Sequence, residues 1–459
     1  MKRTLAEFAR ACGGTLRGLD APYTDVVTDS RTLKRGQLFV ALRGPNFDGH
    51  DFVGAARQAG AAGALVSAPQ PLPLPQVLVI DTQAALERAA RTWRAQFRGP
   101  VVGVGGSNGK TTTKEMTAAI LGQLGPCLAT RGNLNNHIGV PLTLLGLTAE
   151  HRCAVIEMGA NRPGEIALLA ALARPSVGLI TNAGAEHLLG FGTLEGVARA
   201  EGEMVSGLTP AATAVLNADD EFFTLWRGST AARIVTFGLK AAADFSASEI
   251  RSQVDAAGFQ THFRLHAPQG STAIRLSLGG THNVTNALAA AAAATSAGAS
   301  LAEVAAGLAA VRAVPGRLQF RQTAGGAWLT DDAYNANPSS VRAAIEVLMG
   351  LEGRKWLVLG DMGELGPTAE QAHAAIGEFA RGAGIERLYA TGPLMALAVQ
   401  SFGAGAQWFS DVPQLAAHLK SALTADGAAV RVLVKGSRFN RLERVVQALS
   451  GGAGGAGSH

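Results

Sequence analysis

Residues 101–116 read VVGVGGSNGKTTTKEM: an apolar run, a glycine-rich turn, Gly109-Lys110-Thr111, and a stretch that favours a helix. Glycines let backbone N–H groups approach phosphate oxygens, and the N-terminus of the following helix adds a favourable dipole. Lys110 would reach the β- and γ-phosphates, and the Thr111 hydroxyl would ligate Mg²⁺. The stretch therefore predicts a strand, a loop that binds ATP phosphates, and a helix. The residues expected to contact ATP here are Gly106, Ser107, Asn108, Gly109, Lys110, Thr111 and Thr112.

The loop departs from the strict pattern G-x-x-x-x-G-K-(S/T), which would need glycine where this chain has Val104. Glycines stand instead at positions 103, 105 and 106. The alternative is a glycine-rich turn with an incidental lysine. Strand, loop, Gly-Lys-Thr-Thr and helix occur together in the right order, and only eight of the 40 basic residues are lysine. Both observations favour the phosphate loop.

From Val101 onward, short apolar runs alternate with helical stretches, which predicts a parallel sheet with helices on both faces. Strands are expected at 101–104, 154–157, 177–181 and 214–217, with helices near 112–124, 164–173 and 194–207. Residues 243–278 alternate in polarity and predict antiparallel strands attached to that sheet. Helices are expected to follow at 281–296 and 301–310.

Two breaks divide the chain, at Arg98-Gly99-Pro100 and at Pro315-Gly316. Before the first break, a strand at 77–80 and a helix at 82–97 are expected. After the second, strands at 327–330, 355–359, 387–390 and 430–434 alternate with helices, which indicates another doubly wound unit. The prediction is an α/β protein of three domains. These are a small N-terminal α/β domain (1–99), a central parallel-sheet domain with a small antiparallel sheet (100–314) and a C-terminal Rossmann-like domain (315–450). A flexible tail (451–459) follows them.

The bulk composition excludes several classes of protein. The formal net charge of +5 suits anionic ligands, but it is diffuse and shows no basic run, so nucleic-acid binding is not expected. Three cysteines without a CxxC pair argue against disulfides or a thiolate metal site and fit a reducing cytoplasm. The longest apolar stretch, 288–294, is shorter than the ~20 residues that a membrane span requires. We expect a cytoplasmic monomer without membrane insertion.

Polar residues at predicted strand ends are candidates for the chemistry. Glu157 ends a buried strand beside the loop, at the edge of a parallel sheet where a hard cation is usually held. The alternative is a solvated strand-end carboxylate. His187 follows another strand end, although a lone histidine is more often structural. His282 and Asn283 open a helix after two glycines, where they would otherwise serve as a simple cap.

Basic side chains near the second break are also candidates. Arg317 carries a planar guanidinium at the predicted hinge, which suits bidentate contact with phosphate. Lys435 and Arg438 lie in a glycine-containing turn after the apolar strand VRVLV. They would bind an acyl phosphate or substrate carboxylates, unless they are only surface charges.

The loop GSNGKTTTKEM resembles that of the Mur ligases, which is of the TGxxGKT type, with Gly105 in place of threonine. The resemblance continues through most of the chain. The further stretches that carry it are NLNNHIGVPLTLL (Asn133–Leu145), VIEMGANRPGEI (Val155–Ile166), TNAGAEHLLGFG (Thr181–Gly192), GTHNVTNALAA (Gly280–Ala290), VPGR (Val314–Arg317), DDAYNANPSS (Asp331–Ser340), GDMGELG (Gly360–Gly366) and KGSR (Lys435–Arg438). KEM, YNANP and GDMGELG resemble the type that adds D-alanyl-D-alanine, and the DNPR signature of the diaminopimelate-adding type is absent.

The resemblance implies an ATP- and Mg²⁺-dependent ligase that joins D-alanyl-D-alanine to UDP-N-acetylmuramoyl-tripeptide through an acyl phosphate. It implies catalytic roles for Lys110, Glu157, His187 and Arg317. Beyond the loop, it implies ATP contacts at Asn283, Arg317, Asp332, Tyr334 and Asn335, and metal ligands at Thr111, Glu157, His187 and Glu201. The stretches TDSR and FVALRGPNFDGHDF resemble the family's UDP-binding segments. The implied substrate contacts are Ser30, Arg31, Gly44, Asn133, Asn136, His137, Lys435 and Arg438.

Glu201 marks a second departure from the family. In many Mur ligases the helix after the histidine motif carries a lysine that becomes carbamylated and supplies an anionic group for the second Mg²⁺. Aligning VARAEGEM (Val197–Met204) with that helix places Glu201 at the lysine position. A glutamate supplies a carboxylate without modification. Because its side chain is shorter than a carbamylated lysine, a water molecule would bridge the carboxylate and the Mg²⁺ ion. The alternative is a solvated helix glutamate.

Two other functions remain open. A related ligase with a different acceptor, either another Mur type or a folylpolyglutamate synthase, would share the central motifs. TDSR and DGHDF disfavour the folate enzyme, and YNANP with GDMGELG disfavours the other Mur types. The chain would otherwise be an ATP-hydrolysing switch or a binding module that ligates nothing. Phosphate release that requires both the UDP-sugar peptide and the dipeptide would separate these classes.

Overall fold

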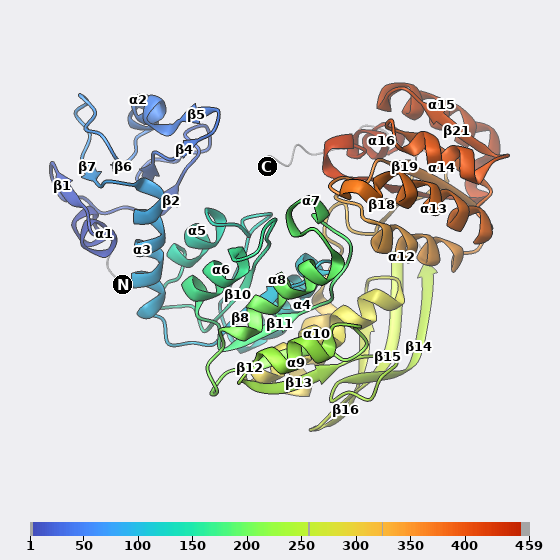
Figure 1. Ribbon diagram of the computed structural model, residues 1–459, viewed down its shortest axis with the longest axis horizontal. Helices are drawn as coiled ribbons and strands as arrows, with labels where there is room; N and C mark the ends of the chain where they lie inside the picture. The colour runs from blue at the N-terminus through green and yellow to red at the C-terminus, as the bar shows by residue number, and fades with distance from the viewer. Residues whose placement is uncertain (1–2, 256–257, 324, 451–459) are drawn as a thin grey trace.

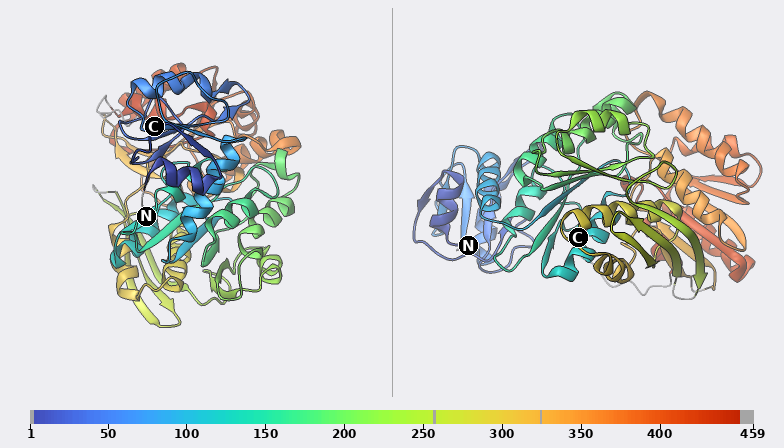
Figure 2. Two further views of the ribbon diagram at one scale, coloured as in Figure 1. Left: turned by 90° about the vertical axis from the view of Figure 1, so that its left-hand side faces the viewer. Right: turned by 90° about the horizontal axis from the view of Figure 1, so that it is seen from below.

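The computed structural model describes residues 3–255, 258–323 and 325–450, so the predicted tail at 451–459 lies outside the described residues. The chain forms three α/β parts in sequence order (Figure 1). Seen from below, the N-terminal and C-terminal parts lie at opposite ends of the central one (Figure 2, right). Among the described residues, no helix is both long and apolar enough to cross a membrane.

The N-terminal part is a five-stranded sheet in the order β1-β7-β6-β3-β2. Its strands are β1 (Thr15–Arg17), β2 (Val26–Val27), β3 (Leu38–Val40), β6 (Gly63–Val66) and β7 (Gln76–Leu78), with β1 antiparallel to β7. A two-stranded hairpin, β4 (Arg43–Gly44) and β5 (Phe47–Asp48), stands beside it. The helices are α1 (Leu5–Cys12), α2 (Val53–Gln58) and α3 (Thr82–Ala95). Asp81 caps α3 by accepting the N–H groups of Gln83 and Ala84, which explains where this predicted helix begins.

The central part is a six-stranded parallel sheet in the order β13-β12-β11-β8-β10-β9. Its strands are β8 (Val101–Gly105), β9 (Cys127–Ala129), β10 (Cys153–Glu157), β11 (Val177–Ile180), β12 (Thr213–Asn217) and β13 (Arg233–Phe237). One face packs on α4 (Lys110–Leu121), α10 (Thr281–Ser296) and α11 (Leu301–Ala310). The other packs on α5 (Gly139–Leu145), α6 (Glu165–Ala173) and α8 (Leu194–Ser206). The predicted parallel sheet with helices on both faces is confirmed, although β9 and β13 were not predicted.

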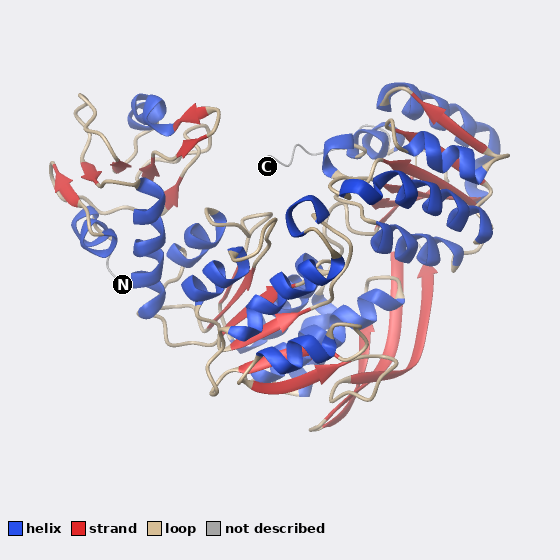
Figure 3. Cartoon of the chain, viewed as in Figure 1, coloured by secondary structure: helices blue, strands red, loops and turns tan. Residues whose placement is uncertain are grey.

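A separate three-stranded antiparallel sheet follows, made of β14 (Ser246–Asp255), β15 (Gly258–Ala267) and β16 (Gly270–Leu276). These strands form a ladder of their own, and they are attached to the parallel sheet as predicted, because Phe245, immediately before β14, bridges Phe237 at the end of β13. Their apolar side chains pack into the same core as α10 and α11. β14 and β15 extend toward the C-terminal part (Figures 1 and 3). There the Phe259 ring lies 5.1 Å from Phe320, which stacks on Trp328 at 4.6 Å.

The C-terminal part is a six-stranded sheet in the order β17-β18-β22-β19-β20-β21. Its strands are β17 (Gln319–Gln322), β18 (Trp328–Asp332), β19 (Arg354–Gly360), β20 (Arg387–Thr391), β21 (Ala406–Phe409) and β22 (Val430–Lys435). All are parallel except β17. The helices α12 (Pro338–Met349), α13 (Ala369–Gly382) and α14 (Met395–Phe402) share one core, and α15 (Val412–Asp426) and α16 (Glu443–Leu449) share another. The doubly wound fold is confirmed. The domain limits at 99/100 and 314/315 stay predictions.

Candidate active site

The phosphate loop leaves the carboxyl end of β8, between the neighbouring strands β10 and β11. It turns through two glycines at positive φ, Gly106 at +113° and Gly109 at +81°, and enters α4 at Lys110. A Cβ on Gly106 would lie 2.1 Å from the Thr181 hydroxyl oxygen, so only glycine fits there. The carboxyl edge of a parallel sheet is where ligands bind in such folds.

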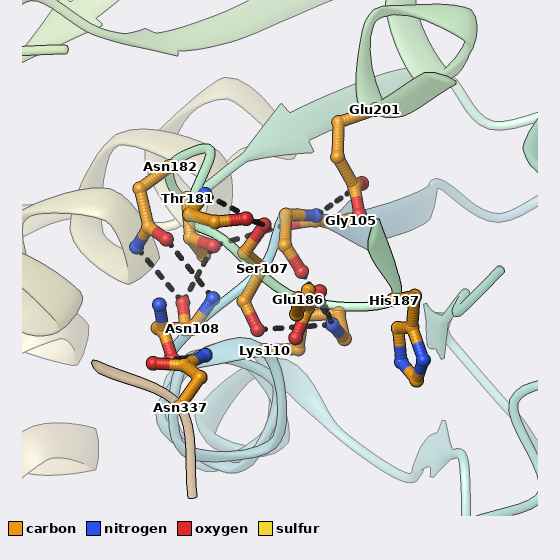
Figure 4. Close-up of polar contacts among 12 residues, drawn as sticks. Gly105, Ser107, Asn108, Lys110, Thr181, Asn182, Glu186, His187, Glu201 and Asn337 are labelled. Atoms are coloured by element: carbon orange, nitrogen blue, oxygen red, sulfur yellow. Dashed lines mark hydrogen bonds and ion pairs between the residues drawn. The ribbon is translucent and has the colours of Figure 1, made fainter. Parts of the chain in front are cut away.

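Lys110 lies over this loop and is not an exposed side chain. Its Nζ donates to the carbonyl oxygens of Gly106 at 2.5 Å and Ser107 at 3.1 Å, and pairs with Glu186 Oε1 at 3.3 Å (Figure 4). Burial by itself lowers the pKa of the ammonium group, but the nearby carboxylates of Glu186, Glu201 and Glu157 outweigh burial and raise the pKa above its usual value. Lys110 is therefore a fixed cation at the start of the helix. Its partner Glu186 was not among the predicted site residues, although it lies within the quoted TNAGAEH stretch.

The carboxylate of Glu157 is the group in this site that best fits a cation ligand. Its Oε1 accepts hydrogen bonds from the Thr111 hydroxyl at 3.3 Å and from Asn135 Nδ2 at 2.9 Å. Its backbone N–H donates to the Thr130 hydroxyl at 2.9 Å. Its Oε2 is buried and has no partner among the described residues. A buried carboxylate oxygen without a donor, next to a threonine hydroxyl, matches the hard oxygen ligands that Mg²⁺ prefers. Neither Asn135 nor Thr130 was predicted, although Asn135 lies within the quoted NLNNH stretch.

His187 lies at the boundary with the C-terminal part. Its backbone adopts φ +50°, and its Nδ1 pairs with the carboxylate of Glu364, whose φ is +62°. Figure 4 shows the His187 ring apart from the pair formed by Lys110 and Glu186. The predicted metal role of His187 stays a prediction, and the described residues contain no cluster of three or more His, Cys, Asp or Glu side chains arranged for a metal ion.

Glu201 supports the phosphate loop from behind. It is 3% exposed, and its Oε2 accepts the Gly106 N–H at 2.5 Å. Burial raises the pKa of Glu201 to about 7, against the opposing effect of Lys110. A Cβ on Gly105 would lie 3.0 Å from Glu201 Oε2 and 3.2 Å from Met204 Cε. The two departures from the family pattern, Gly105 and Glu201, therefore contact each other, and the missing side chain at 105 leaves room for the carboxylate.

A cavity of about 330 Å³ lies beside the loop, between the central and C-terminal parts. This volume is within the usual range of small-molecule sites. The predicted site residues that line it are Asn108, Gly109, Thr112, His282, Asn283, Arg317, Asp332 and Lys435. The structure thus brings together residues from both sides of the predicted hinge.

The helix α10 supplies part of the cavity wall beside the loop. Asn283 is buried, donates from Nδ2 to the Gly279 carbonyl at 2.7 Å, and accepts from Asn286 Nδ2 at 3.1 Å. A Cβ on Gly109 would lie 2.4 Å from Asn286 Oδ1, which explains why α4 and α10 meet at a glycine. Burial lowers the pKa of His282 to about 4. At neutral pH the cavity therefore has a neutral imidazole at this point.

Tyr334 lies against two guanidinium groups. The Arg317 guanidinium lies 4.4 Å from the centre of the Tyr334 ring, and the Arg438 guanidinium lies 5.4 Å from it. Each contact is a cation–π interaction, which holds an arginine in place without using its N–H donors. The donors of Arg317 and Arg438 stay available for anionic ligands. Asn335, by contrast, is exposed, and its Oδ1 accepts its neighbour's N–H at 2.9 Å.

Lys435 forms a buried ion pair instead of presenting its ammonium to solvent. Its Nζ lies 2.6 Å from Asp332 Oδ2 and donates to the Asn335 carbonyl at 2.9 Å. The two charged side chains are 4% and 11% exposed. Their strands, β22 and β18, are neighbours, so the pair joins two residues that are 103 positions apart. The charge of each side chain is therefore already neutralised by the other within the protein. The predicted ligand roles of Lys435 and Asp332 stay predictions.

Replacing Lys435 with methionine should lower the stability of the C-terminal part by about 3 kcal/mol, because it leaves the Asp332 carboxylate buried and unpaired. Differential scanning calorimetry measures the loss. Adding Asp332→Asn to the variant should restore part of the stability, and Lys420→Met at an exposed position is the matched control. Equal melting temperatures for Lys435→Met and Lys420→Met would contradict the assignment.

Apart from Lys435, the candidates for UDP and peptide contacts do not line the cavity. Arg31 is exposed and pairs with Asp29 at 2.7 Å. Gly44 lies in β4, where a Cβ would be 2.6 Å from the Phe47 ring. The Asn136 side chain accepts the N–H groups of Ile138 and Gly139 at the start of α5. The predicted substrate residues that do not line the cavity are Ser30, Arg31, Gly44, Asn133, Asn136, His137 and Arg438.

Comparisons with known proteins place this arrangement among characterised sequences. Three family models match: "Mur ligase family, catalytic domain" over residues 22–95, "Mur ligase middle domain" over 104–294, and "Mur ligase, glutamate ligase domain" over 316–438. The UDP-N-acetylmuramoyl-tripeptide–D-alanyl-D-alanine ligase of Escherichia coli is 46% identical over 448 residues, covering 97% of this chain and 98% of that protein. The Bacillus subtilis ligase of the same name is 36% identical, with 98% of each chain covered.

Solved structures give the same picture. A crystal structure of MurF from Acinetobacter baumannii superposes with a TM-score of 0.90 at 35% identity, covering 98% of this chain and 99% of that one. The MurF ligase of Thermotoga maritima, in complex with ADP, superposes with a TM-score of 0.81 at 29% identity, covering 93% and 97%. The fold and the order of the parts are therefore shared along nearly the whole chain.

Proposed function

The chain belongs to the Mur ligase family, and we propose that its phosphate loop, Glu157 and Arg317 carry out the ligation that this family performs. It is an ATP- and Mg²⁺-dependent ligase that adds D-alanyl-D-alanine to UDP-N-acetylmuramoyl-tripeptide in peptidoglycan synthesis. The observation that carries the assignment of the site is the phosphate loop at a cavity lined by both the central and C-terminal parts.

The reaction has two steps. The terminal carboxylate of the tripeptide attacks the γ-phosphorus of ATP, and ADP leaves, which gives an acyl phosphate. The amine of D-alanyl-D-alanine then attacks the activated carbonyl carbon, the amide bond forms, and phosphate leaves. No protein nucleophile is required. The protein acts by positioning the reactants and by stabilising charge on the transferred phosphoryl group.

The side chains divide this work. Lys110 changes partners from the carbonyls of its own loop to the β- and γ-phosphates. The N–H groups of Gly109 and the first turn of α4 face the phosphates, since those of Gly106, Ser107 and Asn108 already donate within the protein. Thr111 and Glu157 hold the cation, and the unpartnered Oε2 of Glu157 supports that role. Bound Mg²⁺ supplies positive charge to the phosphate oxygens. Arg317, oriented by Tyr334, approaches the phosphates from the C-terminal side of the cavity.

The remaining contacts follow the family resemblance. His187 and Glu201 would hold a second cation, Asn283, Asp332, Tyr334 and Asn335 would contact the nucleotide, and Ser30, Arg31 and Gly44 would bind the UDP group. Asn133, Asn136, His137, Lys435 and Arg438 would contact the peptide substrates. We propose a monomer, since one chain supplies every group named here, and a cytoplasmic location, since all three cysteines are free.

The test is a coupled assay of phosphate release. Release should need ATP, UDP-N-acetylmuramoyl-tripeptide and D-alanyl-D-alanine together, and mass spectrometry should show the UDP-linked pentapeptide. Phosphate release of equal rate from ATP alone would instead indicate a hydrolytic switch. Turnover with a folate and glutamate, and none with the muramoyl substrate, would indicate a folylpolyglutamate synthase.

Glu201→Gln should lower kcat by about tenfold to a hundredfold and raise the Mg²⁺ requirement, because it removes the negative charge of a metal ligand. The glutamine oxygen can still accept the Gly106 N–H, so loop support is retained while the charge is lost. Activity of the parent should not depend on bicarbonate, since no carbamate has to form. The measurement is a Mg²⁺ titration of kcat in parent and variant, with and without bicarbonate. If parent and variant have equal kcat values at limiting Mg²⁺, Glu201 only supports the loop and does not ligate the metal.

A further inference from the structure

The phosphate loop is joined to the C-terminal part by a ring of three side chains. Asn337 Nδ2 donates to Asn108 Oδ1 at 2.8 Å, and Asn108 Nδ2 donates to Ser339 Oγ at 3.1 Å. Ser339 Oγ donates in turn to Asn337 Oδ1 at 3.0 Å. Asn108 is separated from the other two residues by more than 200 positions in sequence, so the ring exists only while the two parts are in contact. Figure 4 shows Asn337 next to Asn108.

Asn108 is anchored on the central side. Its backbone N–H donates to Asn182 Oδ1 at 2.9 Å. Its carbonyl accepts the Thr181 hydroxyl at 2.7 Å and Asn182 Nδ2 at 3.0 Å. These bonds fix the main chain in the middle of the loop and leave the amide side chain free to cross the boundary. Asn108 immediately precedes Gly109 and the start of α4, so the orientation of this anchored residue bears on the N–H groups of the first helical turn.

Asn337 is anchored equally well on the other side. It is 5% exposed and forms the N-cap of α12, where its Oδ1 accepts the Ser340 N–H at 2.9 Å. Pro338 occupies the first turn and fixes the backbone at the helix start. The cap uses the oxygen of the Asn337 amide, and the contact with Asn108 uses its nitrogen. The two functions of one side chain can therefore be separated by substitution.

The backbone around the ring is built for close approach. A Cβ on Gly184 would lie 2.9 Å from Asn108 Nδ2 and 3.3 Å from Ser339 Oγ. Glycine at this position, in the segment after β11, leaves the space that the ring occupies. Asn108 and Ser339 also line the cavity next to the loop. The ring thus closes one side of the nucleotide cavity at the boundary between the two parts.

We propose that Asn108, Asn337 and Ser339 form a latch that completes when the C-terminal part closes on the central part, and that sets the phosphate loop in its reactive orientation. They are positioning residues, since they act through the loop amides and Lys110. The inference rests on the proposed use of this loop for ATP. It adds a direct connection between domain closure and the groups that hold the phosphates.

The principal variant is Asn337→Ser. Serine is as good an N-cap as asparagine, so α12 should keep its start, but its side chain is too short to reach Asn108. We expect kcat to fall by about threefold to tenfold, the range for one lost hydrogen bond, with an unchanged melting temperature. Asp411→Ser is the matched control. It makes the same kind of cap substitution at the start of α15. Within the described part of the chain, the Asp411 side chain bonds only to Gln414 of its own helix start.

A double-mutant cycle with Asn108→Ala separates a latch from independent structural effects. If the residues act as one unit, the double variant should have about the same kcat as the more impaired single variant. The melting temperatures should show no such coupling. Ser339→Ala, at the exposed side of the ring, should give a smaller decrease in kcat.

The outcomes are distinct. Multiplied losses in the double variant, or a kcat for Asn337→Ser within twofold of the parent, would overturn the latch. A parent enzyme that fails to ligate D-alanyl-D-alanine in the coupled assay would instead overturn the proposed function. If both the parent and Asn337→Ser ligate at the normal rate, the latch is rejected and the proposed function is retained.

Discussion

Replacing Lys110 with alanine should lower kcat by at least about a thousandfold, equivalent to about 4 kcal/mol of transition-state stabilisation. The ammonium lies at the N-terminus of α4, within reach of two loop carbonyls and Glu186. In the reaction it has to neutralise charge on the phosphates, and alanine has no group that can do so. Steady-state kinetics of ligation at saturating ATP measures the loss.

The Lys110→Ala variant should also be less stable than the parent. Glu186 and Glu201 would lose their nearest cation, and their carboxylates would remain next to the loop. Some destabilisation is therefore expected, and the melting temperature of the variant has to be measured beside its kcat. Lys240→Ala, at an exposed position, is the matched control and should change neither quantity. A folded Lys110→Ala enzyme with the kcat of the parent would contradict the assignment of the loop.

Replacing Glu157 with glutamine should lower kcat by about a hundredfold to a thousandfold and raise the Mg²⁺ concentration needed for half-maximal activity. Glutamine has the same shape and can still accept from Thr111 and Asn135 through its oxygen. Its NH₂ group, however, replaces the unpartnered Oε2, and an NH₂ group cannot ligate a cation. The fold should stay intact, because the hydrogen bonds that hold the side chain are kept.

A Mg²⁺ titration of kcat distinguishes this effect from simple damage to the site. High Mg²⁺ should restore part of the activity of Glu157→Gln, since the Thr111 hydroxyl and the phosphates still bind the ion. Glu150→Gln, at an exposed position, should behave like the parent at every Mg²⁺ concentration. If Glu157→Gln shows the Mg²⁺ dependence of the parent, the cation lies elsewhere.

Local sequence predicted the parts of the site that depend on neighbouring residues. The strand β8, the glycine-rich turn and α4 follow one another without a gap, so the position of Lys110 could be derived from the chain itself. Glu157 could be placed because it ends a fully buried strand. The helices at 281–296 and 301–310 were predicted with the limits that the structure has. Gly279-Gly280 precedes the first helix, and Ser300 caps the second.

Contacts between distant segments could not be derived in this way. Glu186, Asp332 and Asn337 gain their roles from partners that are 76, 103 and 229 positions away. In the N-terminal sheet only β7 was predicted. In the central and C-terminal sheets, the strands that escaped prediction, β9, β13, β17 and β21, all stand at the edges. Edge strands are half-solvated, so they lack the continuous apolar run that marked the buried strands. The antiparallel strands and their attachment to the parallel sheet were predicted, but the ladder of their own that they form depends on tertiary packing.

The three aromatic rings at the boundary between the antiparallel sheet and the C-terminal sheet have an optical consequence. Trp328 is the indole of that stack, with Phe320 at 4.6 Å and Phe259 beyond it. Because indole emission depends on polarity and on neighbouring rings, sliding of the stack should alter the emission of Trp328. Phe substitutions at the other four tryptophans, Trp93, Trp226, Trp356 and Trp408, would leave Trp328 as the single emitter. Trp328 would then be an intrinsic fluorescence probe of domain movement, and stopped-flow measurements could follow its emission without an attached dye.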